Sequence, residues 1–233
     1  MSSHIARHLD EVRQRIAKAA AAASRDPSSV ALLAVSKTFP ADDVRAAFKA
    51  GQRAFGENYV QESVAKIAEL ADLRGEIQWH FIGPLQSNKT KVVAENFDWV
   101  HSVDRLKIAE RLSAQRAAGM PALNVCLQVN VSGEESKSGV TPGDALALAH
   151  AIAALPNLKL RGLMAIPEAA GSLDEQRMPH RRLRELMDSL RADGLELDTL
   201  SMGMSADIEA AILEGATMVR VGTAIFGARD YSH

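Results

Sequence analysis

Val30-Ala31-Leu32-Leu33-Ala34-Val35 is an unbroken apolar run that ends in Ser36-Lys37-Thr38. A short apolar run followed by polar residues is typical of a strand that is buried on both faces. Similar runs recur along the chain, and each is followed by a longer segment with helical periodicity. We therefore expect strands at residues 30–36, 53–56, 77–82, 99–101, 122–131, 158–165, 197–202 and 218–221.

Strands that alternate with helices indicate a parallel β/α architecture. Two forms remain open at this point, a closed (β/α)8 TIM barrel and an open doubly wound sheet. Ile5, Leu9, Val12 and Ile16 recur at helical spacing and predict an extra N-terminal helix that ends near residues 26–27. No Gly-, Ser- or Pro-rich linker divides the sequence, so we expect residues 1–233 to form a single domain.

The composition is that of an ordinary globular protein, with 47% hydrophobic and 24% charged residues among 233. A net charge of -2 gives no reason to expect nucleic acid as a partner. No apolar run reaches the ~18 residues that would span a membrane, and the N-terminus lacks a signal-peptide core. We expect a cytoplasmic protein without a membrane partner, and a buried thiol at Cys126.

Functional residues in parallel β/α proteins lie at the carboxyl ends of the strands. Lys37 follows the first strand directly. Partial desolvation there favours the neutral amine, the nucleophile that forms an imine with an aldehyde. The alternative is a lysine whose stem is buried while its ammonium reaches solvent.

The last two strands end in glycine and hydroxyl residues. Gly222 and Thr223 follow the strand at 218–221, and Ser205 is expected to open the helix after strand seven. Loops after strands seven and eight of barrels often bind phosphate through backbone N–H groups. The alternative is that Ser205 is an ordinary helix cap and Gly222 an ordinary turn residue. Another helix is expected to start at residues 102–104.

Five stretches together resemble a known family, the pyridoxal phosphate homeostasis proteins, over about residues 5 to 229. The family's fold is similar to the N-terminal barrel domain of alanine racemase. The resemblance therefore implies a closed barrel, with pyridoxal 5′-phosphate (PLP) held as a Schiff base on the lysine that matches Lys37. The stretches are Ser36-Lys37-Thr38, Phe55-Gly56-Glu57-Asn58-Tyr59, His80-Phe81-Ile82-Gly83-Pro84-Leu85-Gln86, residues 200–205 and residues 219–227.

The resemblance also implies roles for individual residues. Arg220 would face the pyridine nitrogen of PLP, while Gly222, Thr223 and Ser205 would hold its phosphate. Ser205 is preferred to Ser201 because its spacing from Arg220 matches that of the racemase phosphate serine.

The remaining matches concern the cofactor's surroundings. Asn58 would line the site. Met164 falls where the racemases stack a histidine on the ring, and Lys137 where they carry an arginine near the phenolic oxygen. These two differences argue against racemase chemistry. His80 and His101, which also follow or end strands, are either cofactor ligands or satisfied rim residues.

The function implied by the resemblance is intracellular PLP homeostasis. The protein would buffer PLP or deliver it to apo PLP-dependent enzymes, and would influence the balance of amino acids and keto acids. No catalytic residue is assigned, and the remaining histidines show no metal-ligand spacing. The alternatives are a racemase of the alanine racemase type and a barrel enzyme that forms an imine with a phosphorylated metabolite.

The racemase alternative needs a second proton carrier. Alanine racemase has a further domain after its barrel, which supplies a tyrosine base from the partner subunit. Here the sequence continues only to residue 233 after Gly227, and its two tyrosines are Tyr59 and Tyr231. Two-base racemisation requires proton carriers on both faces of the substrate. We therefore expect a monomer that does not racemise amino acids efficiently.

Overall fold

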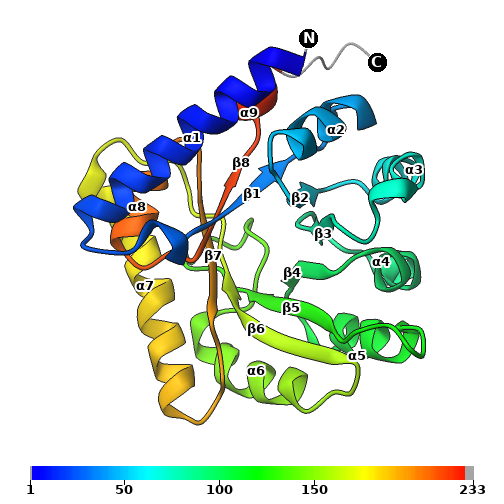
Figure 1. The fold of residues 1–233 in the computed structure, drawn as a ribbon. Coiled ribbons are helices and arrows are strands. Elements are labelled where there is room, and N and C mark those ends of the chain that lie inside the picture. The colour runs from blue at the N-terminus through cyan, green and yellow to red at the C-terminus, as the bar shows by residue number, and fades with distance from the viewer. Residues whose placement is uncertain (1, 229–233) are drawn as a thin grey trace.

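Eight parallel strands close into a barrel in the order β1 to β8 (Figure 1). The structure is a computed structural model and describes residues 2–228. The closed barrel confirms the predicted TIM-barrel fold and removes the open-sheet alternative. The strands are β1 (Ala31–Val35), β2 (Ala54–Glu57), β3 (Gln78–Phe81), β4 (Trp99–Val103), β5 (Leu123–Gln128), β6 (Leu158–Met164), β7 (Thr199–Met204) and β8 (Met218–Val221).

Helices surround the barrel and follow each strand in turn (Figure 1). The first helix precedes β1, as the sequence predicts, and packs against α2, α8 and α9. The helices are α1 (Ser2–Ala22), α2 (Ala41–Lys49), α3 (Val60–Glu69), α4 (Thr90–Asn96), α5 (Leu106–Gln115), α6 (Ala145–Ala153), α7 (Leu173–Ala192), α8 (Ile208–Leu213) and α9 (Thr223–Phe226). Short 3-10 turns are η1 (Pro27–Ser29), η2 (Ala71–Leu73), η3 (Ser87–Lys89) and η4 (Pro142–Asp144).

Two predicted helix starts are wrong. Ser102 and Val103 belong to β4, and the next helix begins only at Leu106. Ser205 lies in a turn, while Asp207 is the N-cap residue of α8. In both places the strand ends two residues later than the sequence predicts, and a β-bulge in each strand adds a residue without ending the pairing.

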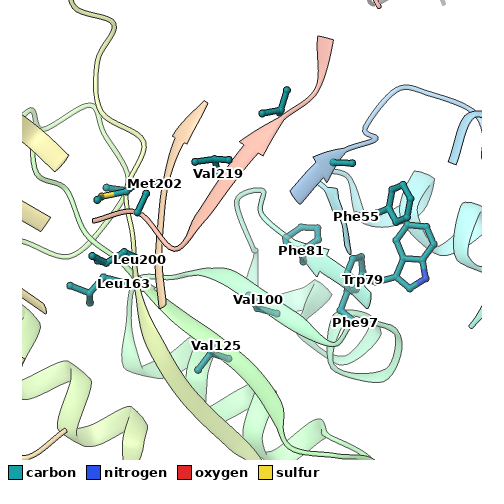
Figure 2. Close-up of a cluster of buried hydrophobic side chains, with 14 of the residues drawn as sticks. Phe55, Trp79, Phe81, Phe97, Val100, Val125, Leu163, Leu200, Met202 and Val219 are labelled. Carbon is teal, nitrogen blue, oxygen red and sulfur yellow. The ribbon is translucent and has the colours of Figure 1, made fainter. Parts of the chain in front are cut away.

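The main hydrophobic core lies between the outer face of the barrel and the helices. Phe55 and Trp79 pack with ring centroids 5.9 Å apart, and Phe81 meets Phe97 edge-on at 5.3 Å (Figure 2). Successive side chains of a strand point to opposite faces, so the strand residues between these core residues point into the barrel.

The inside of the barrel is divided between apolar and polar side chains. Leu33, Val35, Ile82 and Met218 form one small apolar cluster apart from the main core. Trp99, Cys126 and Met164 form a second. The sulfur of Cys126 is fully buried, as predicted. Polar residues from β3, β4, β7 and β8 fill the space that remains, and they build part of the candidate site. Among residues 2–228, no helix combines the length and apolarity needed to cross a membrane.

Candidate functional site

Strand register brings three predicted site segments to one side of the barrel mouth. Ala34 of β1 pairs with Val221 of β8, so the residues that follow them, including Lys37 and Gly222, leave adjacent strands. Met204 of β7 pairs with Arg220 of β8, which places the turn after β7 beside the end of β8. The ends of β7, β8 and β1 thus form a continuous rim.

The loops after β1 and β8 are also held together by side chains. The rings of Phe39 and Phe226 stack with their centroids 5.0 Å apart. Between Lys37 and Phe39, Thr38 has a φ of +69°, a left-handed conformation that is rare for a residue with a branched side chain. The N–H group of Thr38 donates to Glu62 Oε1 at 2.6 Å, which holds this turn. Lys37 therefore belongs to a constrained loop.

An ionic cluster of the buried Ser36, Glu57 and Lys66 and the half-buried Glu62 supports that loop from α3 and β2, and we call it the lysine cluster. The Lys66 ammonium donates to the Ser36 carbonyl at 2.8 Å, to Glu57 at 2.7 Å and to Glu62 at 3.0 Å. The Ser36 hydroxyl also donates to Glu57, at 2.6 Å. The cluster fixes the backbone on both sides of Lys37.

Glu57 carries the least exposed charge of the lysine cluster. Its side chain is 0% exposed, and its Oε2 atom has no hydrogen-bond partner among the described residues. Burial raises the pKa of the Glu57 carboxyl, against the opposing effect of the Lys66 ammonium and the Ser36 hydroxyl. Because burial has the larger effect, this carboxyl is easier to protonate than an exposed glutamate.

A second buried network crosses the inside of the barrel, and we call it the histidine chain. Arg220 Nη1 donates to Ser201 Oγ at 2.8 Å, and Ser201 Oγ lies 2.8 Å from His101 Nδ1. His101 Nε2 lies 2.9 Å from His80 Nδ1. Arg220 Nη2 donates to the carbonyl of Ala165 at 2.9 Å. The chain therefore links β8, β7, β4 and β3.

The arginine sets the direction of hydrogen bonding along the histidine chain. A guanidinium has only donors, so Ser201 accepts from Arg220 and can give its own proton to His101 Nδ1. His101 then carries its proton on Nε2 and donates to His80 Nδ1. This arrangement leaves one ring atom, His80 Nε2, without a partner among the described residues.

Burial keeps both histidines neutral. Burial, with a smaller effect of Arg161, lowers the pKa of His80 to about 3. Burial and the neighbouring His80 and Arg220 lower the pKa of His101 well below its usual value. Burial also lowers the pKa of Arg220 to about 10, which leaves it charged at neutral pH. The histidine chain therefore contains one charged group, the Arg220 guanidinium, and its hydrogen-bond partners are neutral.

β-Bulges shape the rim of this side of the barrel. In β4, the three residue steps from Val100 to Val103 lie opposite the two steps from Val125 to Leu127 in β5, and His101 and Ser102 lie in this irregular stretch. In β7, the bulge contains Gly203, whose φ is +98°. A Cβ atom at Gly203 would lie 2.5 Å from that of Ala211, so glycine is needed both for the conformation and for the close approach of α8.

A cavity of about 410 Å³ opens at the mouth beside the ends of β2 to β6, and we call it the mouth cavity. Of the seven predicted cofactor-binding residues, only Asn58 lines it. Lys37 lies outside its lining, on the neighbouring strand end. Met164 is fully buried against Trp99 and Cys126.

The remaining predicted residues lie around the rim formed by β7 and β8. Gly222 is the N-cap residue of α9, and Thr223 is its first residue. The carbonyl of Ser205 accepts from Arg15 Nη1 at 2.7 Å, while the same guanidinium binds Glu209 through two nitrogens at 2.6 and 2.7 Å. The N-terminal helix therefore anchors the turn that carries Ser205.

Sequence reasoning missed the residues that support the site. Glu62 and Lys66 are spaced four apart on a helix, a pattern that predicts an ion pair. Single polar residues between large apolar ones, such as Ser201 between Leu200 and Met202, predict a polar side chain inside the barrel. The second signal also identifies His80 and Arg220.

No group of three His, Cys, Asp or Glu side chains within residues 2–228 is placed to hold a metal ion. Tyr59 is the N-cap residue of α3 and is 53% exposed. Tyr231, the other tyrosine of the sequence, lies outside the described residues.

Comparison with known proteins defines the class. Residues 8–230 match the family described as alanine racemase, N-terminal domain, and the chain belongs to that family. A protein of Pseudomonas aeruginosa named pyridoxal phosphate homeostasis protein is 65% identical over 229 residues, which are 98% of this chain and 97% of the relative. An Escherichia coli protein of the same name is 53% identical over 98% of each chain. Within the wider class, the chain belongs to the pyridoxal phosphate homeostasis protein family.

A solved structure agrees with this assignment. PipY of Synechococcus elongatus, whose structure was determined with PLP bound, superimposes with a TM-score of 0.84 at 41% identity. The match covers 96% of this chain and 100% of PipY. The barrel and its covering helices are therefore shared with PipY.

Proposed function

We propose that this protein binds PLP as a Schiff base on Lys37 and acts in intracellular PLP homeostasis. The observation that supports the proposal most directly is the strand register: β1, which leads to Lys37, pairs with β8, which leads to Gly222 and Thr223, and β8 also pairs with β7, which leads to the turn with Ser205. Membership of the pyridoxal phosphate homeostasis family and the PLP-bound structure of PipY support the same cofactor.

The residues at the mouth fit the chemistry of PLP. Bound PLP supplies an aldehyde that an amine can attack and a conjugated ring that absorbs visible light. Backbone N–H groups at Gly222 and Thr223, together with Ser205, would hold the phosphate. The buried Arg220 would donate to the pyridine nitrogen, since a guanidinium only donates hydrogen bonds. The unpartnered Oδ1 atom of Asn58 is a further group that a ligand would satisfy.

The role we propose is to buffer PLP and to deliver it to apo PLP-dependent enzymes, without efficient catalysis. The charged Arg220 disfavours a protonated pyridine nitrogen, and an unprotonated ring is a poorer electron sink for carbanion chemistry. Through PLP supply the protein would influence the balance of amino acids and keto acids. We further propose that residues 1–233 act as one PLP-binding domain, as a cytoplasmic monomer.

The test is an absorbance titration of the protein with PLP, followed by borohydride reduction and peptide mapping. We expect a visible band that borohydride removes, with the label on Lys37. Lys37→Ala should abolish the reducible band, because no imine can form at that position. Lys89→Ala removes a lysine that lies in η3 after β3, and it should keep the band. A band that survives in Lys37→Ala, with the label on Lys89 or Lys137, would contradict the proposal.

A further inference from the structure

One polar residue interrupts the core-facing side of α7. The buried residues of this helix are Leu183, Met187, Leu190 and His180. The helix packs against α8 (Figure 1), and the fully buried His180 ring meets Asp207, the N-cap residue of α8. Burying an ionic pair costs desolvation, and an apolar residue of similar size often stabilises a core equally well. His180 therefore calls for an explanation other than the stability of α7.

The partner of His180 closes a short turn after β7. Asp207 Oδ2 lies 2.8 Å from His180 Nε2, and Asp207 Oδ1 accepts from the Met204 N–H group at 2.7 Å. The Asp207 N–H group returns a hydrogen bond to the Met204 carbonyl at 3.0 Å. Residues 204–207 therefore form one closed turn, and Ser205 lies inside it.

The hydrogen bonds keep the Asp207 carboxyl ionised. Burial alone would raise its pKa, but the hydrogen bonds from His180 and from the Met204 N–H group outweigh burial and lower the pKa. An ionised carboxylate only accepts hydrogen bonds, so His180 donates from Nε2. The Asp207 side chain is still 17% exposed. Without the bond from His180, this carboxylate is free to turn toward solvent at the barrel mouth.

Two helices therefore hold the turn that carries Ser205. Arg15 of α1 donates directly to the Ser205 carbonyl at 2.7 Å. His180 of α7 acts at one remove, because it holds the Asp207 carboxylate that closes the turn.

We propose that His180 is a positioning residue for the phosphate of PLP. It fixes the turn that presents Ser205 to the phosphate, and it keeps the Asp207 carboxylate directed toward α7. A carboxylate released from His180 would repel the phosphate, since like charges at close range repel each other. The inference rests on the proposed phosphate role of Ser205, and it adds a residue that controls phosphate affinity without touching the cofactor.

The first test compares PLP with pyridoxal, which lacks the phosphate, by absorbance titration of the full chain. His180→Leu should weaken PLP binding by ~10-fold, because the turn loses a hydrogen bond and the Asp207 carboxylate is released. Pyridoxal binding should be unchanged, since pyridoxal has no group to meet the turn. Equal losses for the two ligands, or no loss for PLP, would overturn the proposal.

Two further variants separate positioning from general damage to the protein. His180→Gln keeps an N–H donor near the place of Nε2 and should recover most of the PLP affinity. His150→Leu removes a histidine of α6 that pairs with Asp193 at an exposed site, and it should leave both affinities unchanged. The proposal is wrong if His180→Gln recovers no PLP affinity, or if His150→Leu loses as much as His180→Leu.

A double-mutant cycle tests whether His180 acts through Asp207. His180→Leu should cause no further loss of PLP affinity when it is added to Asp207→Ala, because the carboxylate that His180 holds is then absent. Losses that multiply in the double variant would show that His180 acts by another route, which contradicts the proposal.

Ser205→Ala separates this inference from the proposed function. A selective loss of PLP binding in Ser205→Ala but not in His180→Leu would overturn the inference and leave the phosphate role of Ser205 standing. An unchanged ratio of PLP to pyridoxal affinity in Ser205→Ala would remove that role and the inference together. The Schiff base on Lys37 is read independently, from the band that borohydride removes.

Discussion

The lysine cluster and the histidine chain bury polar groups at similar depth but handle charge differently. In the lysine cluster, the Lys66 ammonium meets the carboxylates of Glu57 and Glu62 at 2.7 and 3.0 Å. In the histidine chain, the Arg220 guanidinium hydrogen-bonds only to a hydroxyl and a carbonyl. The first network balances charge with charge, whereas the second spreads one charge over neutral dipoles.

The difference follows from what each network supports. The lysine cluster fixes the backbone around Lys37, because Lys66 donates to the Ser36 carbonyl and Glu62 accepts from the Thr38 N–H group. The histidine chain leaves Arg220 without a carboxylate bonded to it. Because no carboxylate neutralises the Arg220 guanidinium, it still attracts a hydrogen-bond acceptor at the barrel mouth. A carboxylate in contact with Arg220 would compete with any such ligand.

The largest effect should come from breaking the lysine cluster. Lys66→Met keeps the length of the side chain but leaves Glu57 buried without a cation. We expect the free energy of unfolding at pH 7 to fall by about 3 kcal/mol, measured by urea denaturation. Adding Glu57→Leu should restore part of the loss, because the unpaired carboxylate is then absent.

The exposed pair Lys91–Glu95 is the control for this prediction, since its Nζ–Oε1 distance is 4.0 Å and its side chains are largely exposed. Lys91→Met should leave the unfolding free energy essentially unchanged. A loss in Lys66→Met no larger than that in Lys91→Met would show that the lysine cluster does not hold the fold through its charges.

A smaller loss is expected when the histidine chain is broken at its hydroxyl. Ser201→Ala removes the contact between Arg220 and His101 and leaves a buried donor and a buried acceptor unpaired. The unfolding free energy should fall by about 2 kcal/mol. Ser28→Ala, at an exposed position of η1, is the matched control and should have little effect. If Ser201→Ala and Ser28→Ala have the same free energy of unfolding, the hydrogen bonds of the histidine chain do not contribute to the stability of the fold.

The smallest expected effect is on the pH dependence of the free energy of unfolding, which should differ between the lysine cluster and the histidine chain. The folded-state pKa of His80 is about 3, below its unfolded value of ~6.5, so its contribution is complete above pH 6.5 and declines as pH falls toward 3. The pKa of Glu57 is raised, so its contribution has the opposite sign and is lost as pH rises through the raised pKa.

The measurement is urea unfolding at pH 7 and pH 5.5. Each histidine buried in the neutral state should cost about 1 kcal/mol of stability between these values. His80→Asn keeps an acceptor for His101 but removes one titrating group, so its loss should be smaller by that amount. Identical losses in wild type and His80→Asn would show that His80 does not titrate on unfolding.

The fold was predictable because both faces of each strand are buried. The eight apolar runs of the sequence all became strands, and residues 218–221 did so without any change of boundary. Closure into a barrel followed only from the family resemblance. Local periodicity does not distinguish a closed parallel sheet from an open one, since the strands of both are buried on both faces.

The site was less predictable because its parts depend on pairing between distant strands. The positions of Lys37, Gly222 and Thr223 followed from the rule that strand ends carry function. Ser102 did not, since a bulge depends on the register of the partner strand. Glu57 also lay inside a recognised stretch without an assigned role, and its partner Lys66 comes from a different element.

The end of the histidine chain stacks on an indole. The rings of His80 and Trp99 lie 5.1 Å apart with planes 13° from parallel. A protonated imidazole in contact with an excited indole quenches its fluorescence, whereas a neutral imidazole does so weakly. Trp79, the other tryptophan, packs on Phe55 in the outer core and is apart from this contact. We therefore expect the emission of Trp99 to report whether the His80 ring is protonated.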